Sequence, residues 1–224
     1  MSKQTNAQKY EQVFRPIDVV LSIHNGLRRG FYAIDRSVLS TARAHGDMIP
    51  TLDKLGLLGE LLGYHAKGEE AAVFPAVDKL TPFVSQAYLI DHRELDDMIN
   101  GFEAIRETPD ALDAARATAV INSQLRIHLD KEDVHLYPIL RERSTDNEQI
   151  SIGQVMSSKI PPERFPILGQ LLLSFLDLDD QVNLTKGWMI LMPPPVFAMA
   201  KQLIKKNVGG NWVKIKQQIP GLTD

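Results

Sequence analysis

Two copies of one short pattern, His65-xxx-Glu69 and His128-xxx-Glu132, hold the residues of this chain best suited to chemistry. Residues four apart lie on the same face of a helix, so each copy presents an imidazole beside a carboxylate. Helix bundles hold metal ligands in their cores with this kind of spacing. The repetition therefore predicts two helices that point metal ligands at a shared interior.

Two further histidines, His24 and His92, fall within the apolar stripes of two other predicted helices. A single histidine in such a stripe is more often a hydrogen-bonded core residue than a ligand. The combination favours metal, because a carboxylate in a bundle core is costly unless it is paired or bound to an ion, and no lysine or arginine occupies an obvious neutralising position. The predicted metal ligands are His24, His65, Glu69, His92, His128 and Glu132.

The chemistry of these ligands restricts the metal. The chain has no cysteine, which excludes disulfides, thiolate zinc sites and iron–sulfur clusters held by this chain. Imidazole and carboxylate suit iron, manganese or zinc. Two bridging carboxylates would leave each ion two histidines and an open position for dioxygen, nitric oxide or peroxide.

The elements that must position these ligands read as four long helices with short connections. Pro16 suits the first turn of the first helix, Thr81-Pro82 marks the start of the third, and Thr108-Pro109-Asp110 opens the fourth. The inward positions of the second helix are predicted as Leu55, Leu58, Leu62, His65, Glu69, Ala72 and Ala76, and those of the fourth as Ile121, Leu125, His128, Glu132 and Ile139. The fold class is therefore all-α, an up-down-up-down four-helix bundle with left-handed packing over residues 14–142.

From about Asn147 the pattern changes to shorter apolar segments separated by proline and glycine. We predict four or five short helices over residues 147–224, as a C-terminal extension that covers the bundle or makes a subunit contact in a homodimer. No titratable cluster recurs there. The last stretch mixes lysines with Trp212 and aliphatic residues, which indicates either a solvated helix face or a basic amphipathic contact with a partner or membrane.

The composition of the 224-residue chain bounds its class. Apolar residues at 44% and charged residues at 24% are near the averages for globular proteins, and the formal net charge of −3 shows no basic excess of the kind that nucleic-acid binding needs. The polar start and the absence of any apolar run of membrane length predict no signal peptide, no membrane span and a cytoplasmic location.

The order and type of the six ligands resemble the hemerythrin-like, or HHE cation-binding, family. The neighbouring segments Glu69-Glu70-Ala-Ala-Val-Phe-Pro75 and Glu132-Asp-Val-His-Leu-Tyr-Pro138 agree with that family. The resemblance implies a hemerythrin-like bundle with a two-metal centre, for which we expect two non-haem iron ions, oxo- or hydroxo-bridged, with manganese or zinc as substitutes. The sequence of these segments is similar to that of the hemerythrin domains of plant iron-sensing ubiquitin ligases. The ligand set also resembles that of an iron-sensing animal F-box protein. No cysteine-rich RING segment is present, so ligase activity is not implied.

Two departures from oxygen-carrying hemerythrins bear on function. Those proteins have a fifth histidine on the third helix where this chain has Asp96, and a His-xxxx-Asp spacing on the fourth helix where it has His128-xxx-Glu132. A seventh ligand is therefore either Asp96 or solvent. Without that imidazole, oxygen reactivity or sensing is favoured over stable oxygen carriage.

Other polar residues are expected near the site or outside it. His135 is a rim histidine or a partner behind the ligands, and His45 lies in a predicted loop. Tyr32, Tyr64 and Tyr88 either donate to a bound oxygen species or fill the core. Three functions stay open on this evidence: a di-iron protein that senses or handles dioxygen, iron or nitrosative stress, a di-iron oxidase, oxygenase or peroxide-consuming enzyme, and a structural bundle without metal.

Overall fold

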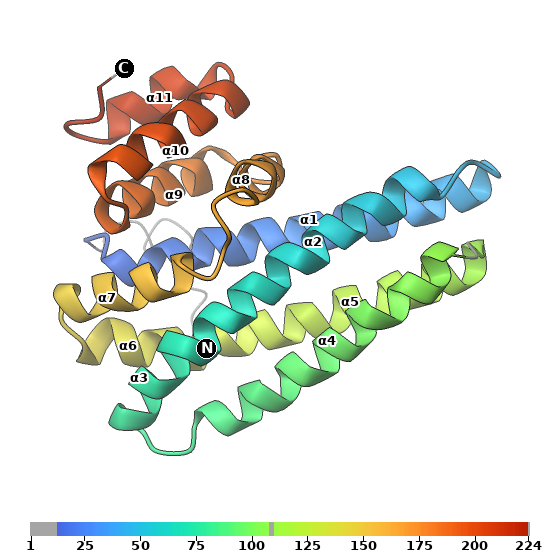
Figure 1. Cartoon of the computed structure of the whole chain (residues 1–224), viewed down its shortest axis with the longest axis horizontal. Coiled ribbons are helices and arrows are strands. Elements are labelled where there is room, and N and C mark those ends of the chain that lie inside the picture. The colour runs from blue at the N-terminus through green and yellow to red at the C-terminus, as the bar shows by residue number, and fades with distance from the viewer. Residues whose placement is uncertain (1–12, 108–109, 224) are drawn as a thin grey trace, which may run out of the picture.

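The computed structural model describes residues 13–107 and 110–223, and within them every regular element is helical. Four rods form a bundle in which α1 packs against α2 and α5, and α4 packs against the same two helices. Successive rods run in opposite directions, which confirms the up-down-up-down topology (Figure 1). The rods are α1 (Val19–Arg43), α2 (Ile49–Gly68) with η3 (Glu69–Val73) and α3 (Phe74–Leu80), α4 (Ser85–Glu107), and α5 (Ala111–Lys131) with η4 (Glu132–Leu136) and α6 (Tyr137–Arg143).

Local signals set the helix starts, with one correction. Pro16 begins a short 3-10 turn, η2 (Pro16–Asp18), that leads into α1, where its fixed φ and missing N–H are tolerated. Asp110 caps α5 by accepting hydrogen bonds from two backbone N–H groups of the first turn, while the predicted Thr108 and Pro109 lie outside the described residues. The start predicted at Thr81-Pro82 is wrong: residues 81–84 form a turn, and α4 begins at Ser85.

The second and fourth rods each contain one π-helical turn, η3 and η4. In these turns the N–H of Phe74 donates to the carbonyl of Glu69, and the N–H of Tyr137 donates to the carbonyl of Glu132, five residues back in both cases. A proline follows each turn, at residues 75 and 138. Proline cannot donate to the carbonyl four residues earlier and its ring collides with it, so a wider turn relieves the conflict.

Each π turn shifts the inward register by one residue, and the predicted core is wrong beyond it. Val73 and Val77 are fully buried, whereas the predicted Ala72 and Ala76 are only partly buried. In the fourth rod Leu140 is fully buried where Ile139 was expected. An uninterrupted 3.6-residue period cannot anticipate the extra residue.

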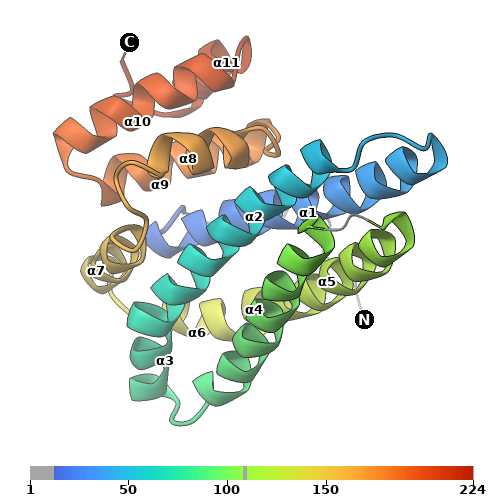
Figure 2. The same ribbon diagram turned by 45° about the vertical axis from the view of Figure 1, so that its right-hand side comes forward.

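Five helices follow the bundle and form what we call the C-terminal lobe: α7 (Asp146–Ser157), α8 (Phe165–Leu173), α9 (Leu178–Leu191), α10 (Pro194–Asn207) and α11 (Asn211–Gln218). This agrees with the four or five short helices that were predicted. Thr145 and Glu148 form a reciprocal cap at the start of α7, and Asp177 caps α9. Figure 2 shows the lobe against α1 and α2, on one side of the bundle.

The lobe meets the bundle at close range. A Cβ added at Gly187 of α9 would lie 2.3 Å from the Val19 side chain of α1, so only glycine fits that position. Arg29 of α1 pairs with Asp180 of α9 at 2.5 Å, and Arg164 forms two hydrogen bonds to Glu60 of α2. Covering the bundle is therefore one role of the lobe, while a homodimer contact stays a prediction.

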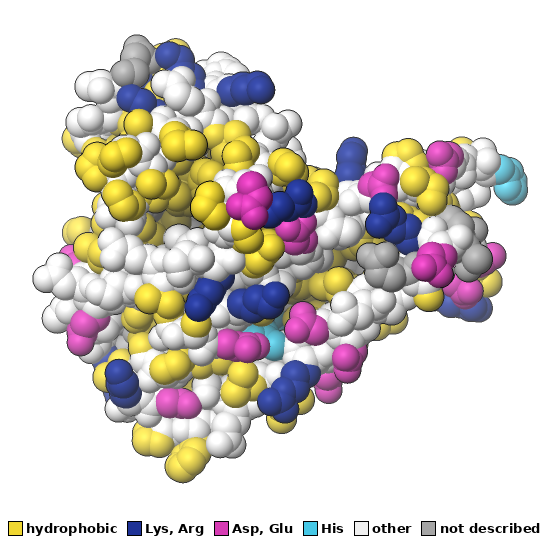
Figure 3. Space-filling view, in the orientation of Figure 1, with side chains coloured by type: hydrophobic (Ala, Val, Ile, Leu, Met, Phe, Trp, Pro, Cys, Tyr) yellow, Lys and Arg dark blue, Asp and Glu magenta, His cyan; other side chains and the backbone are white. Residues whose placement is uncertain are grey.

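Charge is unevenly distributed along the chain. Residues 181–223 contain six lysines and neither aspartate nor glutamate, and we call this part the lysine-rich end. On the face in Figure 3, lysine side chains lie over the last helices, and acidic side chains lie over the bundle. Of the helices in residues 13–107 and 110–223, none has the length and apolar character needed to cross a bilayer.

Candidate metal centre

The six predicted ligands are all buried and converge from the four rods. Each of them is at most 8% exposed. One histidine comes from α1, one from the last turn of α2, one from α4 and one from α5, and each π turn begins at a glutamate of the set. The six are His24, His65, Glu69, His92, His128 and Glu132.

Glu69 divides its two oxygens between two pairs of histidines. Its Oε1 lies 3.2 Å from Nε2 of His65 and 3.8 Å from Nε2 of His24. Its Oε2 lies 3.4 Å from Nε2 of His92. One carboxylate thus faces both sides of the cavity.

Glu132 divides its oxygens in the complementary way. Its Oε1 lies 3.3 Å from Nε2 of His128 and 3.9 Å from Nε2 of His92, while its Oε2 lies 3.7 Å from Nε2 of His24. Two groups of potential metal ligands result, each with all ligand atoms within 4.8 Å of one another. They are His24, His65, Glu69 and Glu132, and Glu69, His92, His128 and Glu132, so both carboxylates belong to both groups.

Several polar atoms of this cluster lack protein partners. Within residues 13–107 and 110–223, no hydrogen bond reaches Oε2 of Glu69, either carboxylate oxygen of Glu132, or Nε2 of His92. Buried polar atoms without partners are rare in folded proteins, and ions are one reason for them. The set contains only imidazole nitrogen and carboxylate oxygen, so it fits a pair of iron, manganese or zinc ions.

The protein alone does not balance the charge of the two carboxylates. Burial and the negative charge of Glu69 raise the pKa of Glu132 well above its usual range. Burial also acts against ionisation of Glu69, but the nearby His65, His24 and His92 outweigh it and hold the pKa of Glu69 well below its usual range. Burial and the neighbouring carboxylate thus disfavour ionisation of Glu132 beside an ionised Glu69, and a cation between the two carboxylates would favour the charged form of both.

Three of the histidines are held from behind by carboxylates. Nδ1 of His24 lies 2.7 Å from Asp133, and Nδ1 of His128 lies 3.1 Å from Asp91. Nδ1 of His92 lies 3.0 Å from Glu70. Carboxylates in this position fix ring orientation and leave Nε2 directed at the ion. The sequence analysis did not single out these three residues, although Glu70 and Asp133 each directly follow a ligand.

Comparison with known proteins now identifies the family. The family model for the hemerythrin HHE cation-binding domain matches residues 15–140, more than half of the chain. The chain belongs to the hemerythrin HHE family. It is also 23% identical over 172 residues to the zinc finger protein BRUTUS of Arabidopsis thaliana, a match that covers 74% of this chain and 14% of BRUTUS. This hemerythrin chain thus spans a small part of that relative's length, and no solved structure matches it at a significant level.

A tyrosine that the sequence analysis missed completes the centre of this hemerythrin. The hydroxyl of Tyr137 donates to Oε1 of Glu69 at 2.5 Å, and its ring meets that of His24 edge-on at 5.5 Å. Burial, together with the charges of Glu69 and Glu132, raises the pKa of Tyr137 well above its usual value, so the phenol stays a proton donor. Its position just before a proline, as with Phe74, was the available signal.

The tyrosines that were considered lie elsewhere. Tyr32 is 47% exposed, and Tyr64 lies partly buried under Lys67. Tyr88 is buried near His128, but its hydroxyl donates to the backbone carbonyl of Lys131. None of the three is shown bonded to a ligand of the centre.

The remaining polar candidates are at the surface. Asp96 is exposed and belongs to neither ligand group, so its position does not support it as a seventh ligand. His135 is exposed, as a rim histidine should be, and His45 is exposed in the turn after α1.

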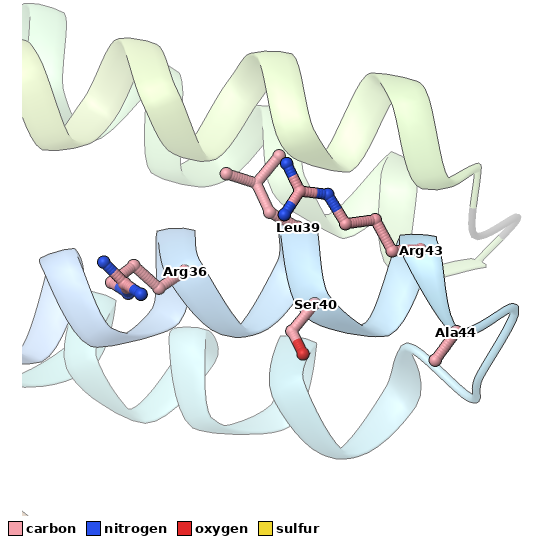
Figure 4. Close-up of a pocket in the computed structure, with 5 residues that line it drawn as sticks. All are labelled: Arg36, Leu39, Ser40, Arg43 and Ala44. Atoms are coloured by element: carbon pink, nitrogen blue, oxygen red, sulfur yellow. The ribbon is translucent and has the colours of Figure 1, made fainter.

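A surface hollow near the far end of α1 is separate from this centre. It is lined by Arg36, Leu39, Ser40, Arg43 and Ala44, and Figure 4 shows these side chains on successive turns of one helix. Arg36 lies about 18 Å along α1 from His24, given the rise per residue of a helix. The metal centre is therefore defined by buried polar atoms and not by this hollow.

Proposed function

We propose that this protein is a non-haem di-iron protein that binds dioxygen or a related small molecule, in order to sense or handle oxygen, iron or nitrosative stress. The observation that carries the proposal is the sharing of Glu69 and Glu132 between two ligand groups. Each carboxylate points one oxygen at each histidine pair. Shared carboxylates are how bundle cores hold two ions side by side.

Each ion would take two histidines from the protein. His24 and His65 would hold one ion, His92 and His128 the other, with Glu69 and Glu132 between them. When bound, an iron pair supplies redox chemistry and a position that an exogenous ligand can occupy. The protein would supply buried surroundings, imidazoles oriented by carboxylates, and two carboxylates able to lie between the ions.

The space beside the centre suits a small ligand. A cavity of about 80 Å³ lies between α4 and α5, where the outer side of His128 lines it with Asp91 and Lys131. Such a volume accommodates a few water-sized molecules. Lys131 pairs with Asp91 at the mouth and its side chain is 39% exposed, so the ion pair can screen the approach from solvent.

Metal analysis tests the proposal. The protein is stripped of metal, loaded anaerobically with ferrous iron, desalted and analysed for iron per chain, and its near-ultraviolet spectrum is recorded after exposure to air. We expect two iron ions per chain, and charge-transfer absorption that appears on oxidation. One ion or fewer would contradict the proposal.

Two conservative substitutions examine the bridges. Glu69→Gln and Glu132→Gln keep the volume and remove the charge, so both should lower iron content below two per chain. Asp96→Asn is the matched control, because Asp96 is an exposed carboxylate on α4. A Glu→Gln variant that retained both ions with an unchanged spectrum would show that the carboxylates do not bridge.

A further inference from the structure

The second and fourth rods carry an internal sequence repeat that extends past the ligands. Residues 65–75 and 128–138 both read His, three residues, Glu, an acidic residue, three residues, an aromatic residue and proline. The aromatic positions are Phe74 and Tyr137. Phe74 stacks on His92 with ring centres 5.1 Å apart, and Tyr137 meets His24 at 5.5 Å. The two halves of the centre therefore share one sequence pattern and place an aromatic ring against a histidine, stacked in one half and edge-on in the other.

A hydroxyl group is one difference between the halves. Tyr137 donates to Oε1 of Glu69 at 2.5 Å, with both side chains buried. Phe74, its counterpart, has no donor to offer. In the part of the chain that the structure describes, neither oxygen of Glu132 has a hydrogen-bond partner.

We propose that Tyr137 is a positioning residue that fixes Glu69 as the permanent bridge and leaves Glu132 as the bridge that shifts when a small ligand enters. The inference rests on the proposed iron pair, within which it assigns different tasks to the two carboxylates. No covalent step is involved, only the rotation of one carboxylate.

The physical reason is that rotation of the Glu69 carboxylate would break a hydrogen bond, whereas rotation of the Glu132 carboxylate would not. Short O–H···O⁻ hydrogen bonds are strong, and turning Glu69 away would leave a buried phenol without an acceptor. Turning Glu132 breaks no hydrogen bond to the described residues. The nearby cation Arg28 does not restrain it directly, because Arg28 is paired with Asp130 and Asp133.

A reciprocal swap tests the assignment. Tyr137→Phe removes the hydroxyl from one half, Phe74→Tyr places one at the equivalent position of the other, and a double variant exchanges them. Tyr88→Phe is the matched control, since it removes a buried hydroxyl near His128 that bonds to backbone. Each protein is loaded with iron, and iron content, Mössbauer spectrum, iron release to a chelator and azide association are measured.

The expected results differ between the variants. Tyr137→Phe should release iron about tenfold faster, and Phe74→Tyr should slow azide association about tenfold, since one hydrogen bond to a charged group has about that weight. Wild-type protein should show two unequal iron environments, which Tyr137→Phe brings closer together. Tyr88→Phe should match the wild type throughout.

The outcomes separate this inference from the proposed function. Fewer than two iron ions in the wild type would refute the iron pair itself. Two ions with wild-type release, azide and Mössbauer behaviour in Tyr137→Phe would overturn the role of Tyr137. If Phe74→Tyr does not fold, the release rate and Mössbauer spectrum of Tyr137→Phe decide the question alone.

Discussion

The two ends of the bundle differ in what they bury. At the end that holds the six predicted ligands, which we call the ligand end, four imidazoles and two carboxylates lie in the core, and the C-terminal lobe covers the outer faces of α1 and α2. At the distal end, where α1 meets α2 and α4 approaches α5, the core is mainly aliphatic and aromatic, with residues such as Val38 and Phe102 beside the buried Thr51 and Thr118, and the lobe does not reach it (Figure 1). Polar interiors need walls that exclude water and hold side chains in place, whereas an apolar interior is stabilised by its own burial.

The largest effect should come from removing a ligand. His65→Ala and His128→Ala are expected to lose iron and, with it, the stabilisation that metal gives to the folded state, about 2.7 kcal/mol when free iron is at roughly 100 times Kd. Thermal unfolding with and without iron measures this difference. His45→Ala, in the exposed turn beyond the distal end of α1, should keep both iron and stability. Equal losses of iron and stability in all three variants would contradict the assignment of His65 and His128, and not His45, as ligands.

The carboxylates behind the histidines should have the next largest effect. Asp133→Asn removes the anion beside Nδ1 of His24 and should weaken iron binding by roughly 10- to 100-fold. Competition with a chelator of known affinity gives the change. Asp97→Asn, an exposed carboxylate of α4, is the control. Unaltered affinity in Asp133→Asn would mean that ring orientation is set by packing alone.

One added methyl group should disrupt the packing between the C-terminal lobe and the bundle. In Gly187→Ala the new Cβ meets Val19 at 2.3 Å, and we expect a loss of about 1–3 kcal/mol in the free energy of unfolding. The same change at Gly63 of α2 meets nothing within 4 Å and should stabilise the helix by about 1 kcal/mol. Denaturant unfolding of both variants gives the comparison. If both substitutions raised the free energy of unfolding, the lobe would have to move away from Val19 at little cost.

The smallest effect is expected at the distal end. Asp110→Ala removes the side-chain cap of α5 and should cost about 1 kcal/mol while iron content stays unchanged. Urea unfolding and metal analysis of the same samples check both parts. Iron loss in this variant would show that a change at the distal end of α5 also affects the metal centre.

The sequence was sufficient to predict the four rods and the burial of the predicted ligands. His24, His65, His92 and His128 stand in apolar stripes whose period identifies the buried face, so a one-dimensional pattern predicts a three-dimensional convergence. The number of short helices in the lobe was also predictable, because proline and glycine mark their ends.

The sequence reasoning failed where one helical period was assumed throughout. Ala72 and Ile139 were expected in the core, but the π turns rotate the following residues and bury Val73 and Leu140 in their place. The same rotation turns Tyr137 inward, five residues after Glu132. The prolines after the π turns were visible in the sequence, but the extra residue follows from a backbone adjustment that side-chain periodicity does not describe.

The lysine-rich end separates positive from negative charge along a chain whose net charge is only −3. Since residues 181–223 add six positive charges and no negative ones, the acidic excess resides in the rest of the chain. An electric field or a charged surface will therefore orient the protein, with the lysines toward anions and the bundle toward cations. Retention on both cation- and anion-exchange resins at low ionic strength, lost together as salt screens the charges, is the chromatographic behaviour to expect.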